Sequence, residues 1–160
     1  MPRVGSQAWY HMAKHDKELF APFVLSERGQ KIDKFWFDLR LGNGRSCPAY
    51  YSEAERNMVQ ALTCFRADVI IWEGNIPTVV ECKPYAGLAC FGQIEGYAEL
   101  FNDKFGYYPH KLIITDNPRP DLPYLLSKKG IAILYYKPVQ DSVIELAENM
   151  TLSRIEDLPR

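Results

Sequence analysis

Residues 65–83 contain two runs rich in β-branched and aromatic residues, separated by a short polar segment. Such runs are typical of buried strands. The segment between them contains Gly74 and Asn75, which tolerate the positive φ angles of a two-residue hairpin loop. The pattern therefore predicts two antiparallel strands joined at this loop, with Glu73 opposite Ile76.

Three charged residues interrupt this apolar hairpin at one end. Counting outward from the loop places Asp68 opposite Glu81, and directly opposed residues lie roughly 5 Å apart on one face of a sheet. Lys83 is two residues beyond Glu81 and shares its face. The hairpin is therefore expected to gather two carboxylates and one ammonium group.

Opposed carboxylates repel each other, so a partly buried pair must take up a proton, pair with a cation or bind a metal. Hard divalent cations such as Mg²⁺ prefer carboxylate, carbonyl and water oxygens. The alternative is a solvated strand end at which Asp68 and Glu81 pair with Arg66 and Lys83. The short motif leaves both interpretations open.

The remaining periodicity predicts further helices and strands around this hairpin. Strands separated by helices from residue 76 onward favour an α/β fold, a mixed central sheet flanked by helices. Outside the hairpin, we expect a helix at 6–20, a strand at 34–41, a turn at 42–44 leading into a second strand toward Tyr51, helices at 52–64, 87–101 and 122–129, and strands at 111–115 and 131–136.

The helix expected at 87–101 carries Gln93 and Tyr97, which are four residues apart and share a helical face. With Asp68, then Glu81-x-Lys83, then this helix and a strand in order, the chain resembles the PD-(D/E)XK nuclease superfamily. It is most similar to the N-terminal nuclease domain of type I restriction enzyme motor subunits. The resemblance covers roughly residues 52–137 and implies a restriction-endonuclease-like core.

The resemblance also assigns roles around a metal ion. It implies that Asp68 and Glu81 are ligands of Mg²⁺, with Mn²⁺ as a substitute and the backbone carbonyl of Cys82 as a third ligand. Lys83 would position the water that attacks the phosphate. The implied activity is that of a deoxyribonuclease, which hydrolyses DNA phosphodiester bonds with Mg²⁺-activated water; RNA is left open as a substrate.

Three more residues have two interpretations each. Under the resemblance, Gln93 and Tyr97 support the site or touch substrate, but Gln93 could equally lie on the surface and Tyr97 in the core. Glu55 either joins the site as the acidic residue of a helix or forms a capping box with Ser52.

His11 and His15 are four residues apart, lack a third ligand and are expected to be solvated.

Length and composition fit one domain over residues 1–160. At 160 residues and 47% hydrophobic composition, the chain can bury a sizeable core. We expect a nuclease-like core at about 52–137, an N-terminal helix and hairpin at 4–51 and a C-terminal tail at 138–160. Four cysteines without CxxC spacing, and no apolar run long enough for a signal peptide or a membrane span, favour a cytoplasmic protein without membrane contact.

The net charge of −1 is low for a nucleic-acid-binding protein. Basic residues accumulate in the N-terminal part, where they either face phosphates or belong to a mixed solvated surface. No P-loop is present, so an ATP-driven motor is not encoded in this sequence. We expect a nuclease that acts on DNA alone, as a homodimer, or with a separate motor or recognition partner; the alternative is a catalytically silent nuclease-like fold that binds nucleic acid or protein.

Overall fold

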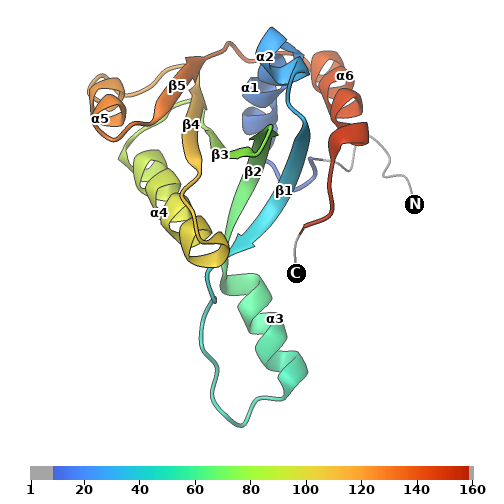
Figure 1. Ribbon diagram of the computed structural model, residues 1–160, viewed down its shortest axis with the longest axis vertical. Coiled ribbons are helices and arrows are strands. Elements are labelled where there is room, and N and C mark those ends of the chain that lie inside the picture. The colour runs from blue at the N-terminus through green and yellow to red at the C-terminus, as the bar shows by residue number, and fades with distance from the viewer. Residues whose placement is uncertain (1–8, 159–160) are drawn as a thin grey trace.

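A five-stranded mixed sheet runs through the computed structural model, which describes residues 9–158 (Figure 1). Strands β1, β2 and β3 pair antiparallel in sequence order, and β3, β4 and β5 pair parallel. The predicted mixed α/β sheet is therefore confirmed. The strands are β1 (Lys34–Leu41), β2 (Phe65–Glu73), β3 (Ile76–Cys82), β4 (His110–Thr115) and β5 (Ala132–Tyr135).

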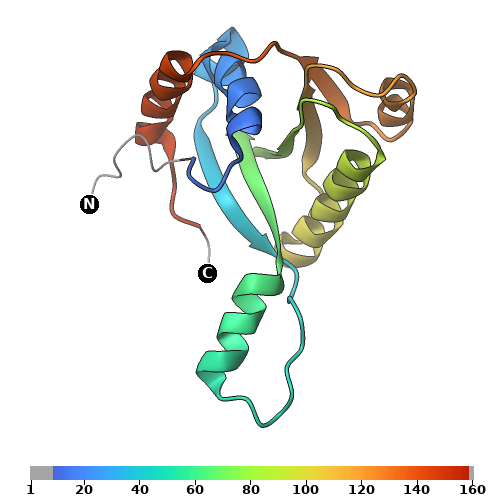
Figure 2. The same cartoon turned by 180° about the vertical axis from the view of Figure 1, so that it is seen from behind.

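Helices cover both faces of this sheet (Figures 1 and 2). Buried side chains of α1 and α6 pack against one face and form what we call the α1 core. Those of α4 and α5 pack against the other face and form the α4 core. The helices are α1 (Lys14–Leu25), α2 (Glu27–Gln30), α3 (Glu53–Thr63), α4 (Leu88–Phe105), α5 (Leu122–Lys128) and α6 (Asp141–Thr151), followed by a 3₁₀ turn, η2 (Leu152–Arg154).

The central hairpin has the predicted register. Glu73 pairs with Ile76, and Gly74 takes the positive φ of 65° that the tight loop requires. Pairing continues to Val69 opposite Val80. The paired ladder ends there, one position before Asp68 and Glu81, so the pairing of these two residues stays a prediction from the count.

Helix α1 begins and ends later than the range expected at 6–20, of which residues 6–8 lie outside the described part. It starts after Ala13 and continues through Pro22 to Leu25. Proline lacks an N–H and so leaves the carbonyl four residues earlier without its helical partner. That carbonyl belongs to Glu18 and accepts a hydrogen bond from the backbone N–H of Val139 at 3.2 Å, so the helix tolerates Pro22.

The second strand expected toward Tyr51 is wrong, because β1 pairs with β2 instead. Residues 42–51 form an irregular segment that leads into α3, and we call residues 42–64 the arm. Helix α3 carries the predicted capping box between Ser52 and Glu55 but buries none of its residues. The arm projects from one end of the sheet (Figure 1).

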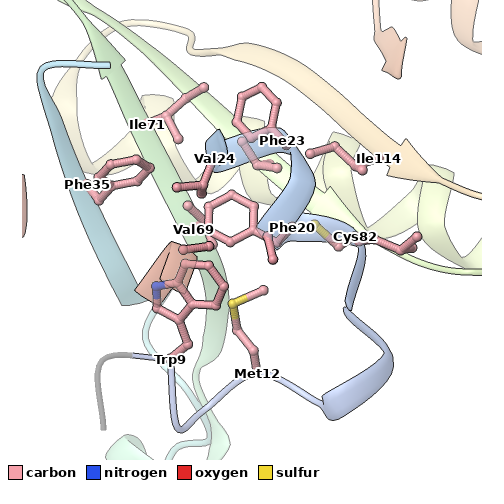
Figure 3. Packing of buried hydrophobic residues seen from close by; sticks show 14 of the residues in the cluster. Trp9, Met12, Phe20, Phe23, Val24, Phe35, Val69, Ile71, Cys82 and Ile114 are labelled. Carbon is pink, nitrogen blue, oxygen red and sulfur yellow. The ribbon is translucent and has the colours of Figure 1, made fainter. Parts of the chain in front are cut away.

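Aromatic and aliphatic side chains fill the α1 core (Figure 3). Phe20 and Phe23 of α1 lie against Phe35, Val69 and other sheet residues. The segment expected as a C-terminal tail contributes α6 to this core through Ile144 and Ala147. Beyond α6, Ile155 bridges Phe35 of the edge strand β1.

None of the helices in residues 9–158 combines the length and the apolar character needed to cross a bilayer.

Candidate active site

Three acidic side chains and one lysine meet where β3 ends. The Nζ atom of Lys83 lies 3.8 Å from Oε1 of Glu81 and 3.6 Å from Oδ2 of Asp16. The side chains of Glu81 and Asp16 are only 4% and 7% exposed. Asp68 lies within electrostatic range of both carboxylates, since it contributes to the pKa shift of each. We call Asp16, Asp68, Glu81 and Lys83 the carboxylate cluster.

The structure therefore brings together the predicted trio of Asp68, Glu81 and Lys83. It adds Asp16, which sequence reasoning missed while it weighed Glu55 as the acidic residue of a helix. Asp16 lies in the first turn of α1, where a negative charge interacts favourably with the helix dipole. The available signal was an acidic residue three positions before the apolar run that starts at Leu19, but the helix was expected to start too early for Asp16 to mark its first turn.

Burial raises the pKa of every carboxylate in the cluster. For Glu81, burial and then the repulsion of Asp68 outweigh the attraction of Lys83 and raise the pKa to about 7. Burial is also the largest cause of the raised pKa of Asp16 and of Asp68. All three groups are therefore harder to ionise than in water, and a cation bound among them would relieve that cost.

Lys83 remains a cation in this setting. Partial burial lowers its pKa, but the attraction of Asp16, Glu81 and Asp68 outweighs burial, and the net pKa is raised. A lysine held in its protonated form is a poor acceptor for a proton from water. Its chemistry in the cluster is that of a positive charge and hydrogen-bond donor.

Helix α4 borders the cluster with two further groups. Cys90 is buried, and burial followed by the repulsion of Glu81 raises the pKa of its thiol to about 12. Burial, then Glu81 and Asp68, likewise raise the pKa of the Tyr97 hydroxyl to about 12. Both groups are therefore neutral at pH 7 and near the carboxylates.

Gln93 and Tyr97 occupy one face of α4, as their spacing predicts. With Phe65, they line a hollow of about 260 Å³ whose lining also includes Gly92 and Gly96. Gln93 is exposed, and Tyr97 also packs against the α4 core. The structure thus gives Tyr97 features of both the core and the site interpretations, and it leaves the Gln93 amide free to meet a ligand in the hollow.

His11 lies beside the cluster and is partly buried, so the expectation of a solvated residue is wrong. Its Nε2 atom lies 2.8 Å from the backbone carbonyl oxygen of Asp68. The ring packs against Phe37, with 5.8 Å between the ring centroids, and Tyr10 meets it edge-on. His15 is exposed and lies 3.4 Å from Glu18, in agreement with the expectation.

Two other sequence expectations have clear outcomes. The Glu55 carboxylate accepts the backbone N–H of Ser52 at 2.7 Å on the exposed arm, which confirms the capping box. Most N-terminal basic residues form ion pairs, which supports the mixed solvated surface. The pairs are Lys14–Asp141, Lys17–Glu148, Arg28–Glu73, Lys31–Glu27 and Lys34–Glu156.

The cluster fits a divalent cation that keeps part of its water shell. Within residues 9–158, no three His, Cys, Asp and Glu side chains stand together as a ready-made metal cage. Mg²⁺ seldom uses such a cage; it binds through one or two carboxylates, waters and substrate phosphates. When all three carboxylates are ionised, they and the one ammonium group leave two negative charges, which a divalent cation balances.

No protein-family model matches the sequence, and no curated protein matches it. Solved structures of similar arrangement include EndoMS in complex with double-stranded DNA, with 14% identity, a TM-score of 0.49, and coverage of 81% of this chain and 47% of that chain. A repair endonuclease from Pyrococcus abyssi has 15% identity and a TM-score of 0.47, over 76% of this chain and 46% of that chain.

The chain thus spans about half the length of these solved structures. At such identities and TM-scores, the activity of this chain must be argued from its own side chains. Its fold places Asp68 on β2, Glu81 on β3, Lys83 directly after β3, and Gln93 and Tyr97 on the helix that leads into β4. This is the order of elements that the PD-(D/E)XK resemblance implies.

Proposed function

We propose that this chain is a divalent-metal-dependent nuclease that hydrolyses the phosphodiester bonds of DNA. The observation that carries the proposal is a group of three carboxylates beside a single ammonium group: Asp16 and Glu81 are buried, Asp68 is partly buried, and the pKa of Glu81 is raised to about 7. Burying such charges costs stability, and perturbed ionisable groups of this kind concentrate at functional sites.

Asp68 and Glu81 would hold the metal, with the Cys82 carbonyl as a further oxygen ligand and Asp16 in reach of a metal-bound water. Mg²⁺ is the expected ion, and Mn²⁺ is expected to replace it. When bound, such an ion acidifies a water and offsets negative charge on the phosphate. The chain's own groups then have to orient the reactants.

Lys83 is the group suited to place the attacking water. Its Nζ sits between Asp16 and Glu81, so its position is fixed from two sides. As a cation, it also attracts the phosphate and stabilises the negative charge that develops during attack. The exposed amide of Gln93 and the neutral hydroxyl of Tyr97 can donate hydrogen bonds to the substrate next to it.

The DNA backbone also needs cationic contacts away from the metal. Arg40 and Arg45 are exposed and have no ion-pair partner among the described residues. Arg40 and Lys104 line a hollow of about 390 Å³ at the base of the arm, where Lys104 donates to the Arg40 carbonyl at 3.1 Å. These residues are candidates for contacts with phosphates.

The test is incubation of the purified chain with supercoiled plasmid, linear duplex and single-stranded DNA in Mg²⁺ or Mn²⁺, beside an EDTA control. We expect cleavage that requires the divalent ion, and the three substrates separate endonuclease from exonuclease action. A matched RNA oligonucleotide tests the alternative substrate. Metal binding and DNA binding without cleavage of any substrate would refute the enzymatic proposal and identify a catalytically silent binding fold.

A further inference from the structure

The alternation of side chains between the two faces of the sheet is interrupted at Asp38 and at Asp68. In a regular strand, every second side chain points to the same face. On β1, Phe35 and Phe37 belong to the α1 core, whereas Leu39 belongs to the α4 core. A strand that kept its alternation would place all three on one face, so the alternation breaks between Phe37 and Leu39.

Strand β2 breaks its alternation at the same row. Val69 and Ile71 belong to the α1 core, but Ala67 belongs to the α4 core. Pairing of Phe37 with Val69 and of Leu39 with Ala67 places Asp38 opposite Asp68 by count. Both breaks therefore fall on one pair of aspartates, one of which is in the carboxylate cluster.

The backbone of Asp38 accounts for the break in β1. Its φ is 58°, which makes it the one non-glycine residue of positive φ in residues 9–158. Aspartate is among the few non-glycine residues that tolerate this left-handed region, and such conformations concentrate at functional sites. The Asp38 carboxylate is held by Arg66, with 2.7 Å between Oδ2 and Nη1.

At this irregular row, a side chain from outside the sheet bonds to the backbone of Asp68. That side chain is His11, which comes from the segment before α1. A carbonyl oxygen accepts hydrogen bonds only, so the contact of 2.8 Å requires the His11 proton to be on Nε2. The other ring nitrogen, Nδ1, is buried and has no hydrogen-bond partner within the described residues.

An unpaired buried nitrogen is costly, because its interaction with water is lost and not replaced. The ring lies against the aromatic rings of Phe37 and Tyr10, so a phenylalanine would suit these contacts without that cost. What phenylalanine lacks is the N–H that reaches the Asp68 carbonyl. The hydrogen bond from Nε2 to the Asp68 carbonyl therefore accounts for a histidine at this position, despite the cost of its unpaired Nδ1.

We propose that His11 is a positioning residue that anchors the Asp68 backbone at the break in strand alternation and so fixes the orientation of the Asp68 carboxylate for metal binding. This inference rests on the proposed function, since it assigns His11 a role toward the metal held by Asp68. His11 itself touches no reacting atom. Residues that support metal ligands in this way change metal affinity by about 10–100-fold when they are replaced.

Two substitutions separate positioning from packing. His11→Phe keeps an aromatic ring and removes the donor, whereas His11→Gln keeps an N–H donor and removes the ring. We expect His11→Phe to weaken Mn²⁺ binding at least about 10-fold in calorimetric titration, with thermal stability unchanged or raised. His11→Gln should keep the affinity within about threefold of wild type, even if the melting temperature falls. His110→Ala, which removes an exposed histidine from β4, is the control and should change neither quantity.

The opposite pattern would identify a packing residue and overturn the inference: unchanged Mn²⁺ affinity in His11→Phe, with affinity lost in His11→Gln. Equal loss in both variants would also overturn it, because the donor would then not be the feature that matters. If the wild-type chain binds no divalent ion, the proposed function fails and this inference falls with it. If wild type binds Mn²⁺ and Asp68→Asn abolishes binding while His11→Phe does not weaken it, only the inference fails.

Discussion

The carboxylate cluster buries the charged side chains of Asp16 and Glu81, whereas the arm exposes apolar side chains. Counted over the whole residue, Glu81 in the carboxylate cluster is 3% exposed, while Met58 and Leu62 on α3 are 63% and 77% exposed. Buried carboxylates lower the stability of the folded chain, because they lose water without full compensation. The exposed apolar residues of the arm cost little, because isolated apolar side chains are common on protein surfaces.

If the proposed function is right, this contrast separates a region that serves chemistry at a cost in stability from a region that does neither. The cluster would be more stable with neutral residues in place of its carboxylates. The arm, with no buried residue in α3, adds little to the free energy of unfolding. Mutations in the two regions should therefore differ in their effect on activity. Changes in the cluster should remove activity without lowering stability, and changes in the arm should alter stability little.

The largest effect is expected when a carboxylate is removed from the cluster. Asp68→Ala and Glu81→Ala should each reduce metal-dependent cleavage by more than about 1,000-fold, because removing a direct metal ligand costs more than removing a residue that only supports a ligand. The melting temperature without metal should hold or rise, because repulsion and desolvation are relieved. The rise in melting temperature on adding Mg²⁺ should disappear. Wild-type cleavage at saturating Mg²⁺ in either variant would refute the assignment of the site; Glu145→Gln, at an exposed position of α6, is the control.

The next effect concerns the cation in the cluster. Lys83→Ala should lower the rate of cleavage by about 100–1,000-fold, the size of effect seen when an electrostatic donor is removed. Metal affinity should be retained, because the carboxylates remain. Lys83→Arg should restore little, since a planar guanidinium places its charge differently. Calorimetry and single-turnover rates measured together check this; normal turnover with metal affinity lost would contradict the role of Lys83.

The stability of the metal-free chain should fall as pH rises toward neutrality. The pKa of Glu81 is raised from 4.5 to about 7 on folding, mainly by burial. Between these values, the folded chain binds more protons than the unfolded chain, so the free energy of unfolding decreases as pH rises, by roughly 3 kcal/mol for this group above pH 7. Burial shifts Asp16 and Asp68 in the same direction. Urea unfolding of wild type and Glu81→Gln from pH 5 to pH 8 measures the difference; identical pH slopes would rule out a buried, ionising Glu81.

The smallest effect is expected in the arm. Leu62→Ala should change the free energy of unfolding by less than about 0.5 kcal/mol, as most surface substitutions do. Leu126, fully buried in the α4 core, is the matched control, and its replacement by alanine should cost about 2–5 kcal/mol. Urea titrations of both variants make the comparison. A loss for Leu62→Ala near that of Leu126→Ala would show that the arm is covered in solution.

The local parts of the fold could be predicted from the sequence, because short-range rules determine them. The loop at Gly74 set the hairpin register, and the Ser52 capping box marked the start of α3. The pairing of β1 with β2 across the arm could not be predicted in this way, because it joins residues far apart in the chain. A turn at 42–44 therefore suggested a local hairpin that does not exist.

In the candidate site, too, the residues close together in the sequence could be predicted and those brought in from elsewhere could not. Asp68, Glu81 and Lys83 lie on one hairpin, so its register alone brings them together. Asp16 and His11 reach the site only because α1 and the segment before it pack across the sheet. The left-handed Asp38 leaves no mark in the hydrophobic pattern, since the pattern is regular on each side of it.

The base of the arm offers an insertion point for protein engineering. The chain leaves the sheet at Leu41 and returns at Phe65, and these two residues are paired neighbours in the β1–β2 ladder. A turn of a few residues could therefore replace the arm and reconnect the strands, and shortening the loop would recover about 1–2 kcal/mol of closure entropy. A labelled peptide or a small reporter domain with neighbouring termini could be grafted there. Its signal could then be used to test whether metal or DNA binds at the carboxylate cluster.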